Sequence, residues 1–383
     1  MTRISVSRSV LRWAIERSGK ASAVQRKFPK VREWERGESQ PTLRQLEKLA
    51  KETATPLGYL FLSEPPEERL PIPHFRTLGD QPARRPSTDL LEIVHTMERR
   101  QAWMHEYLAE QGEAPLPFVR SAKIEDEFQQ IARKMREALE LPEAWAARQR
   151  TWTEALGELR HRMEEVGIIV TATGIVGNNT RRKLDPTEFR GFVLVDEFAP
   201  LVFINSVDGR AAQMFTLAHE LAHVWFGSSA AFDLRDMQPA PDRTEQACNR
   251  VAAEFLVPGR ELRQLWSLAR RDPEPFQTVA RQFKVSVLVA ARRALDLRLV
   301  TRTEFLDFYR AYLADERRKA AAQSEGGNFY ATQNLRLGRR FAEAVVRATK
   351  EGKLLYREAY QLTGLYGKAF ERYAETLGFG AAA

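Results

Sequence analysis

The sequence predicts an α+β fold that is mainly α-helical. Apolar residues spaced three and four apart dominate both ends of the 383-residue chain, which is the pattern of amphipathic helices. Between these ends, three short runs rich in Val, Ile and Phe indicate β-strands. A chain of this length is long enough for two or three domains with their own cores, so folding requires neither a disulfide nor a metal.

Composition narrows the class of protein. Hydrophobic residues make up 43% and charged residues 29% of the chain, which excludes chain-wide disorder. The single cysteine, Cys248, cannot form an internal disulfide, and no run approaches the roughly 18–20 apolar residues of a membrane span. Residues 1–6 lack the basic-then-apolar layout of a secretory signal. We therefore expect a cytoplasmic protein without a membrane partner.

The net charge of +8 is unevenly distributed. Residues 1–85 carry +7, residues 86–258 carry −8 and residues 259–383 carry +9. A nucleic-acid surface needs cationic charge and a hydrolytic site does not. The acidic middle and the basic ends therefore suggest separate functions, with solvated lysines and arginines on helix faces as the alternative explanation.

Residues 1–64 form the first predicted domain, with five short helices. The expected helices cover residues 7–18, 21–28, 31–37 and 56–62, and a fourth in chain order starts after Thr42 with Leu43, Leu46 and Leu49 on one face. Thr42 is placed to cap the fourth of them. Five short helices in about 60 residues fit a helix-turn-helix module.

This module resembles the XRE/Cro-type helix-turn-helix family. The residues that carry the resemblance, in order, are Trp34, Glu35, Gly37, Pro41, Leu46, Leu49 and Ala50. In that family the third helix enters the major groove, so the resemblance implies DNA contacts by Lys30, Arg32, Glu33 and Arg36. The short second helix, 21–28, departs from the pattern because it lacks a clear apolar stripe. The alternative is a helical cap that contacts protein and not DNA.

Proline marks the first domain boundary. Residues 65–88 contain Pro65, Pro66, Pro71, Pro73, Pro82 and Pro86, a density that interrupts helices and is typical of a linker. The second domain is predicted over residues 89–300, with long charged helices before strands at 167–172, 191–195 and 201–205. The last two strands are separated by a short turn and predict a hairpin.

The motif that carries chemistry is His219-Glu220-Leu221-Ala222-His223. We expect it on a helix that Asp208 caps, that runs from residue 209 or 210 to residue 226, and that Gly227 ends. Positions i and i+4 share one helical face, so both imidazoles can bind one Zn²⁺ while the intervening carboxylate acts as general base on a water. The alternative is a core helix whose histidines form ordinary hydrogen bonds.

A catalytic zinc site usually has three protein ligands, so another residue is needed. The next predicted helix carries Glu245 and Glu254. Nine residues at about 100° each place them on opposite faces, so only one can reach the metal. Spacing does not choose between them. Cys248 is a further candidate on the Glu245 face, although a lone cysteine among apolar neighbours is usually a small core residue.

The two motifs together resemble the ImmA/IrrE family of metallopeptidases. The resemblance lies in the run from Met214 to His223 and in E-x-x-C-N-x-x-A-A-E-F-L-V-P, which begins at Glu245. It implies that His219, His223 and Glu245 bind zinc and that Glu220 is the general base. Asn249 is then a residue that supports the ligands or packs behind them, and Glu254 a packing or ion-pair residue.

The resemblance continues at lower specificity over residues 276–296, which look like the helix-turn-helix-like helices that follow the peptidase core in that family. These helices either contact DNA or line the cleft of the expected active site. Residues 301–383 are predicted as a helical C-terminal region, with an exposed hinge at 317–327.

The predicted function is a zinc-dependent endopeptidase with a DNA-binding module, which cleaves a partner transcriptional repressor or regulator to derepress genes. The alternative is a DNA-binding transcriptional regulator or antitoxin that pairs with a toxin and has little or no turnover. A purely structural zinc conflicts with Glu220, which a closed site would not need. Two histidines and a carboxylate also accept Mn²⁺ or Fe²⁺. A substrate peptide is expected to pair with the exposed edge of the hairpin. The sequence indicates no oligomeric state.

Overall fold

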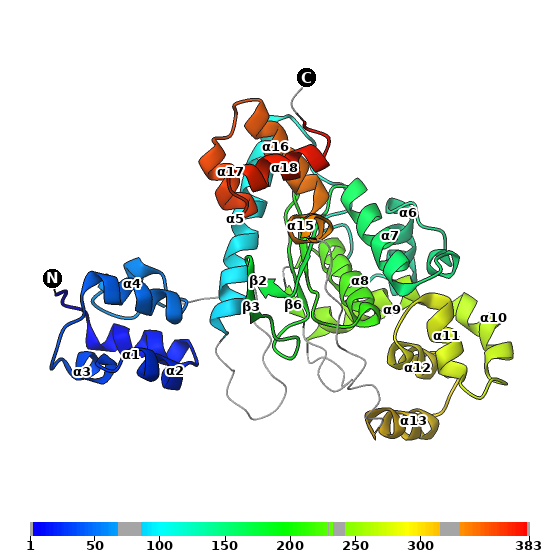
Figure 1. Cartoon of the computed structure of the whole chain (residues 1–383). Helices are drawn as coiled ribbons and strands as arrows, with labels where there is room; N and C mark the ends of the chain where they lie inside the picture. Colours follow the sequence, from blue (N-terminus) through cyan, green and yellow to red (C-terminus); the bar gives the residue numbers. More distant parts are fainter. Residues whose placement is uncertain (1–2, 68–85, 229, 233–241, 315–328, 381–383) are drawn as a thin grey trace. The chain divides into compact units, whose positions relative to one another are not determined.

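The fold is α+β and mainly helical, as the sequence predicts (Figure 1). The computed structural model describes residues 3–67, 86–228, 230–232, 242–314 and 329–380. These residues fall into two compact units: 3–67 and 86–94 belong to the first, and those from 95 onward to the second. Among them, no helix combines the length and the apolar character that crossing a membrane requires.

Residues 3–67 of the first unit contain five helical segments, where the sequence predicts five helices. Four are α-helices and the last is a 3-10 helix: α1 (Arg8–Arg17), α2 (Ala21–Lys27), α3 (Val31–Arg36), α4 (Leu43–Glu52) and η1 (Leu57–Phe61). Thr42 caps α4 as predicted, because its side chain accepts a hydrogen bond from the Gln45 amide and its own amide donates to the Gln45 side chain. The rings of Phe28 and Trp34 lie 6.1 Å apart between the second and third helices. Most of the predicted linker, residues 68–85, lies outside the described residues.

The second unit contains the remaining helices and all the named strands. The helices are α5 (Thr88–Glu110, from residue 95 on), α6 (Phe128–Ala138), η2 (Trp145–Arg148), α7 (Trp152–Glu165), α8 (Arg210–Phe226), α9 (Arg243–Leu256), α10 (Gly259–Ala269), α11 (Pro275–Phe283), α12 (Val287–Asp296), α13 (Arg302–Ala314), α15 (Phe329–Leu337), α16 (Arg339–Lys350), α17 (Tyr356–Thr363) and α18 (Lys368–Thr376). The described part of residues 301–383 is therefore helical, as predicted. The predicted hinge at 317–327 lies outside the described residues.

The strands form a four-stranded sheet and a separate two-stranded ribbon. The sheet has the order β1-β5-β4-β6, with β1 (Ile169–Thr173), β4 (Gly191–Leu194), β5 (Leu201–Asn205) and β6 (Ala230–Phe232). The predicted hairpin is present, because β4 and β5 pair antiparallel with Gly191 opposite Ile204. β1 runs parallel to β5. The ribbon pairs β2 (Ile175–Val176) with β3 (Asn179–Lys183), whose polar sequence carries no apolar alternation that could reveal it.

The prediction of an open hairpin edge is wrong. β5 lies between β1 and β4, and β4 also pairs with β6, placing Gly191 opposite Phe232. A strand that follows His223 by only a few residues thus pairs with the edge of the hairpin. The sequence did not reveal this because strand pairing depends on long-range folding and β6 is only three residues long.

Both faces of the sheet are covered. On one face, Val170, Val202 and Ile204 join the main hydrophobic core together with side chains of α7 and α8. On the other face, Phe192 and Phe203 stack with their centroids 4.8 Å apart, and α5 docks through Gln101, whose Nε2 donates to two backbone carbonyls. Burial on both faces explains why these strands are continuous apolar runs rather than alternating ones.

Candidate metal centre

The site is built on α8, which packs between the sheet and α9. Most of its residues are buried all round, including Leu217, Leu221 and Trp225. The helix ends at Gly227, whose φ of 75° is the left-handed conformation that glycine adopts without strain. The helix covers residues 210–226 as predicted, but the predicted cap is wrong: the N-cap residue is Gly209, and no side chain caps the helix. Asp208 Oδ1 accepts only the Gly209 amide, at 2.9 Å, because Asp208 lies one position too early. A helix that is apolar on every side holds its few polar side chains in a dry, fixed setting.

Three side chains converge on one point. His219 Nε2 and His223 Nε2 are 3.1 Å apart. Glu245, in the first turn of α9, places Oε2 3.1 Å from His219 Nε2 and Oε1 3.2 Å from His223 Nε2. The two histidines are almost completely buried and Glu245 is 8% exposed. The start of α9 is held by Asp242, whose side chain accepts hydrogen bonds from the Thr244 and Glu245 amides.

The other nitrogen of each imidazole has its own partner. His219 Nδ1 lies 3.1 Å from Asn249 Oδ1, and His223 Nδ1 lies 2.8 Å from Ser228 Oγ. An amide oxygen only accepts, so a neutral His219 with its proton on Nδ1 would leave the Nε2 lone pair for a metal. Partners of this kind orient imidazole ligands in metal sites. Asn249 was expected near the ligands; Ser228 was missed, because no spacing rule identifies a serine just beyond a helix end.

The carboxylates have strongly shifted pKa values. Burial alone would raise the pKa of Glu245, but hydrogen bonds from His219 and His223 hold it well below its ordinary value. Burial raises the pKa of Glu220 well above its ordinary value, and the nearby charge of Glu245 raises it further. Burial lowers the pKa of His219. The site thus contains one ionised and one readily protonated carboxylate.

These residues fit a divalent metal. His219, His223 and Glu245 each offer one ligand atom, and the three atoms lie within 4.8 Å of one another. Two neutral imidazoles and one carboxylate are the donor set of open zinc sites, in which a further position remains for water or substrate. Both carboxylate oxygens of Glu220 are buried without a hydrogen-bond partner among the described residues. A buried carboxylate in that state requires a partner that the described residues do not supply.

The other two candidate ligands lie elsewhere. Glu254 forms a buried ion pair with Arg293 and accepts a hydrogen bond from the Gly259 amide, so it has the ion-pair role expected if Glu245 faces the histidines. Cys248 is fully buried in the main hydrophobic core. Burial raises the pKa of its thiol well above the ordinary value, which disfavours the thiolate that a metal would bind.

Residues 163–295 match a peptidase family model described as the IrrE N-terminal-like domain. The matched segment runs from the end of α7 into α12 and includes the three convergent side chains as well as Glu220. It supports the ImmA/IrrE peptidase resemblance for this part of the chain. Residues 337–376, which span α16 to α18, match a domain of unknown function. Comparison with curated proteins found no match, and neither did comparison with solved structures.

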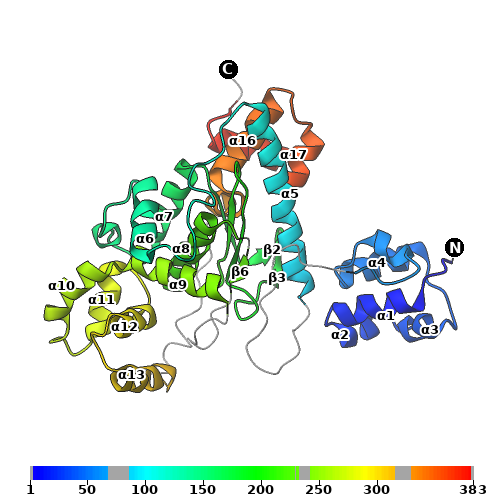
Figure 2. The same ribbon diagram turned by 180° about the vertical axis from the view of Figure 1, so that it is seen from behind.

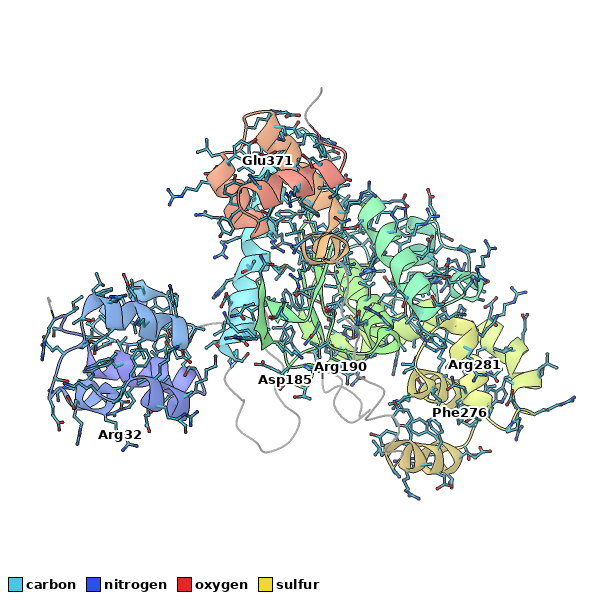
Figure 3. The ribbon with its side chains drawn as sticks, viewed as in Figure 1. Arg32, Asp185, Arg190, Phe276, Arg281 and Glu371 are labelled. Carbon is cyan, nitrogen blue, oxygen red and sulfur yellow. The ribbon has the colours of Figure 1, made fainter. Side chains whose placement is uncertain are left out.

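The predicted DNA-contacting residues lie in the first unit, outside both matched segments. Lys30, Arg32 and Arg36 are exposed, and Figure 3 shows Arg32 pointing away from the body of the unit. Glu33 is half-buried and accepts a hydrogen bond from Ser39 Oγ at 2.9 Å. Arg36 pairs with Glu38 at 3.1 Å. The three cationic side chains are therefore accessible to solvent, whereas the Glu33 carboxylate is hydrogen-bonded to Ser39, just after the helix.

Proposed function

We propose that the chain is a zinc-dependent endopeptidase with a DNA-binding module, and that it cleaves a partner transcriptional repressor or regulator. The peptidase match over residues 163–295 supports the class of reaction. The observation that carries the proposal is Glu220, a fully buried carboxylate without a protein partner among the described residues, one position away from a convergent imidazole. A structural metal site would give no reason to bury such a group.

Zn²⁺ held by His219, His223 and Glu245 would supply a Lewis acid that polarises the peptide carbonyl and makes water more acidic. Glu220 then accepts the proton of the attacking water and delivers it to the nitrogen of the departing amine. Its raised pKa suits this second transfer, because a protonated carboxyl is needed to give the proton back. Asn249 and Ser228 keep the two imidazole rings in place during both transfers. The same donor set accepts Mn²⁺ or Fe²⁺.

The test compares full-length wild type with Glu220→Gln on a library of natural peptides and on the protein encoded by the neighbouring gene, with cleavage read by mass spectrometry of new N-termini. Glu220→Gln should keep its metal and its fold and lose cleavage by about 10²–10⁴-fold. Glu197→Gln, an exposed surface change, is the matched control and should cleave as wild type does. Cleavage by Glu220→Gln at the wild-type rate, or none by zinc-loaded wild type, would contradict the proposal.

A second candidate is a DNA-binding regulator or antitoxin with little or no turnover. The exposed cations of α3 favour it. The neighbouring gene discriminates between the two: a small repressor there is a cleavage substrate, whereas a toxin-like nuclease is a partner to be neutralised. Under this second function, zinc-loaded wild type binds DNA or the toxin and produces no new N-termini.

A further inference from the structure

The second unit contains a cavity of about 700 Å³ between α5 and the helices α16 and α17. Figures 1 and 2 both show α17 beside α5. The volume lies in the range of small-molecule sites. No residue of the candidate metal centre lines this cavity, so the inference below is independent of the proposed peptidase function.

A buried arginine lines the cavity without a counter-ion. Arg100 is 8% exposed. Its Nε donates to the Leu362 carbonyl and its Nη1 to the Arg336 carbonyl, each at 2.9 Å. Among the described residues, no carboxylate forms an ion pair with it, and burial together with the charge of Arg99 lowers its pKa to about 10. The guanidinium also lies 5.7 Å from the centroid of the Phe341 ring. Neither carbonyls nor a ring neutralise its charge, so an anion from outside the chain would be stabilised here.

Aromatic rings form the next part of the wall. Trp103 and Tyr107 stack with their centroids 5.2 Å apart and an interplanar angle of 14°. Trp103 is fixed from behind by Phe341, which it meets edge-on at 5.7 Å. Tyr366, which also lines the cavity, is 66% exposed. Fixed aromatic side chains beside an open cavity suit a planar ring.

Charge is arranged along α5 from one end of the cavity to the other. Arg99 and Arg100 lie at one end, and Glu106 and Glu110 lie toward the other, about 10 and 16 Å beyond Arg99 along the helix at about 1.5 Å per residue. Trp103 lies between them. The other lining charges are already engaged, because Lys353 pairs with Glu351 at 2.8 Å and Glu358 accepts from the Leu355 amide. The two arginines therefore lie at one end of the cavity and Trp103 in the middle. Glu106 and Glu110 lie toward the other end, where Lys353 adds a positive charge near Glu110.

We propose that this cavity binds a small anion that carries a planar, amino-bearing ring, of the chemical class of a purine nucleoside monophosphate. The anionic group binds at Arg99 and Arg100. The ring packs against Trp103, and its amino edge faces Glu106. Each part of such a ligand matches one part of the wall, and neither a bare phosphate nor a neutral nucleoside satisfies all three.

Isothermal titration calorimetry on the full chain tests the proposal with adenosine monophosphate and guanosine monophosphate as probes. Ribose 5-phosphate, which lacks the ring, and adenosine, which lacks the anion, are the half-ligand controls. We expect at least one nucleotide to bind once per chain, and both half-ligands to bind at least about tenfold more weakly. Raising the salt concentration should weaken nucleotide binding.

Substituting Arg100 could disrupt the fold, because its side chain bonds to carbonyls of two other helices. The variants are therefore made at two exposed residues instead. Arg99→Gln and Tyr366→Ala should each weaken nucleotide binding by about three- to tenfold. Arg310→Gln, an exposed arginine on α13 that does not line the cavity, should leave binding unchanged. The proposal is overturned if neither nucleotide binds at millimolar concentration, if ribose 5-phosphate binds as well as the nucleotides, or if Arg99→Gln and Tyr366→Ala bind as wild type does.

Discussion

Glu254 and Arg293 form an ion pair across 39 positions of the chain, with side-chain exposures of 11% and 4%. The pair joins α9 to α12, and Arg293 Nε also donates to the Val257 carbonyl at 3.0 Å. Glu245 lies on the opposite side of the same helix, against His219 and His223. The two glutamates therefore have different roles: Glu254 links α9 to α12, and Glu245 faces the candidate metal site.

Removing the Glu254 carboxylate should destabilise the fold. Glu254→Gln leaves Arg293 buried without its counter-ion, so we expect a loss of about 3–5 kcal/mol in the free energy of unfolding. Urea denaturation of the metal-free protein measures it. The double variant Glu254→Gln with Arg293→Met should recover part of that loss, because both charges are then absent. A single variant as stable as wild type would show that the pair contributes nothing.

The same two glutamates should differ in metal content. Glu245→Gln removes one of three convergent ligand atoms and should lose bound zinc, whereas Glu254→Gln and Glu220→Gln should each retain about one zinc per chain. Elemental analysis of the purified variants is the measurement. Zinc lost with Glu254→Gln and kept with Glu245→Gln would reverse the assignment.

The outer partners of the histidines should tune metal affinity without being ligands. Asn249→Ala and Ser228→Ala each remove a hydrogen-bond partner of one Nδ1 atom and should weaken zinc binding by about 10–100-fold. Competition with a chromogenic chelator gives the affinity. Arg250→Ala, an exposed change on the same helix as Asn249, is the control, and equal affinities in all three variants would argue against a positioning role.

Glu164 should make stability depend on pH near neutrality. Burial raises the pKa of Glu164 from 4.5 to about 7, and the nearby charge of Glu343 adds to the rise. The Arg339 amide, which donates a hydrogen bond to Glu164 at 2.7 Å, and the charge of Arg160 both lower this pKa in part. The protonated form is thus favoured in the folded state. Its contribution to stability is complete below about pH 4.5 and disappears as the pH rises through about 7.

Glu164→Gln remains neutral at every pH, so its loss of stability between pH 5 and 8 should be smaller than that of wild type, by at most about 3 kcal/mol. Urea denaturation at both pH values measures this difference. Glu165→Gln, an exposed neighbour, should follow the wild-type profile. An identical profile for Glu164→Gln would refute the prediction.

If α3 contacts DNA, its exposed cations should contribute to affinity and salt dependence. Arg32→Ala with Arg36→Ala should weaken DNA binding, and removing each cation that binds a phosphate should reduce the slope of log affinity against log salt by about one. Fluorescence anisotropy on labelled duplexes measures both. Lys48→Ala on α4 is a matched exposed change; an equal effect there would point to general charge attraction rather than to α3.

Local patterns were sufficient for much of the molecule. The bounds of α8, the cap of α4 and the hairpin of β4 and β5 follow from residues within a few positions of one another. The shared face of His219 and His223 is equally local, because an i, i+4 spacing brings two side chains together on any α-helix. The sequence alone therefore identified the motif and the element that carries it.

Tertiary structure decided what lies opposite each local feature. Helical spacing separates Glu245 from Glu254, but only the packing of α9 against α8 turns Glu245 toward the histidines. Likewise, β6 covers the hairpin edge, and Arg100 meets carbonyls 236 and 262 positions away. Periodicity determines which residues share a face, because the repeat of a helix or strand depends only on the dihedral angles of neighbouring residues. The pairing of one face with another depends on the burial of apolar surface from distant segments, which a local pattern does not encode.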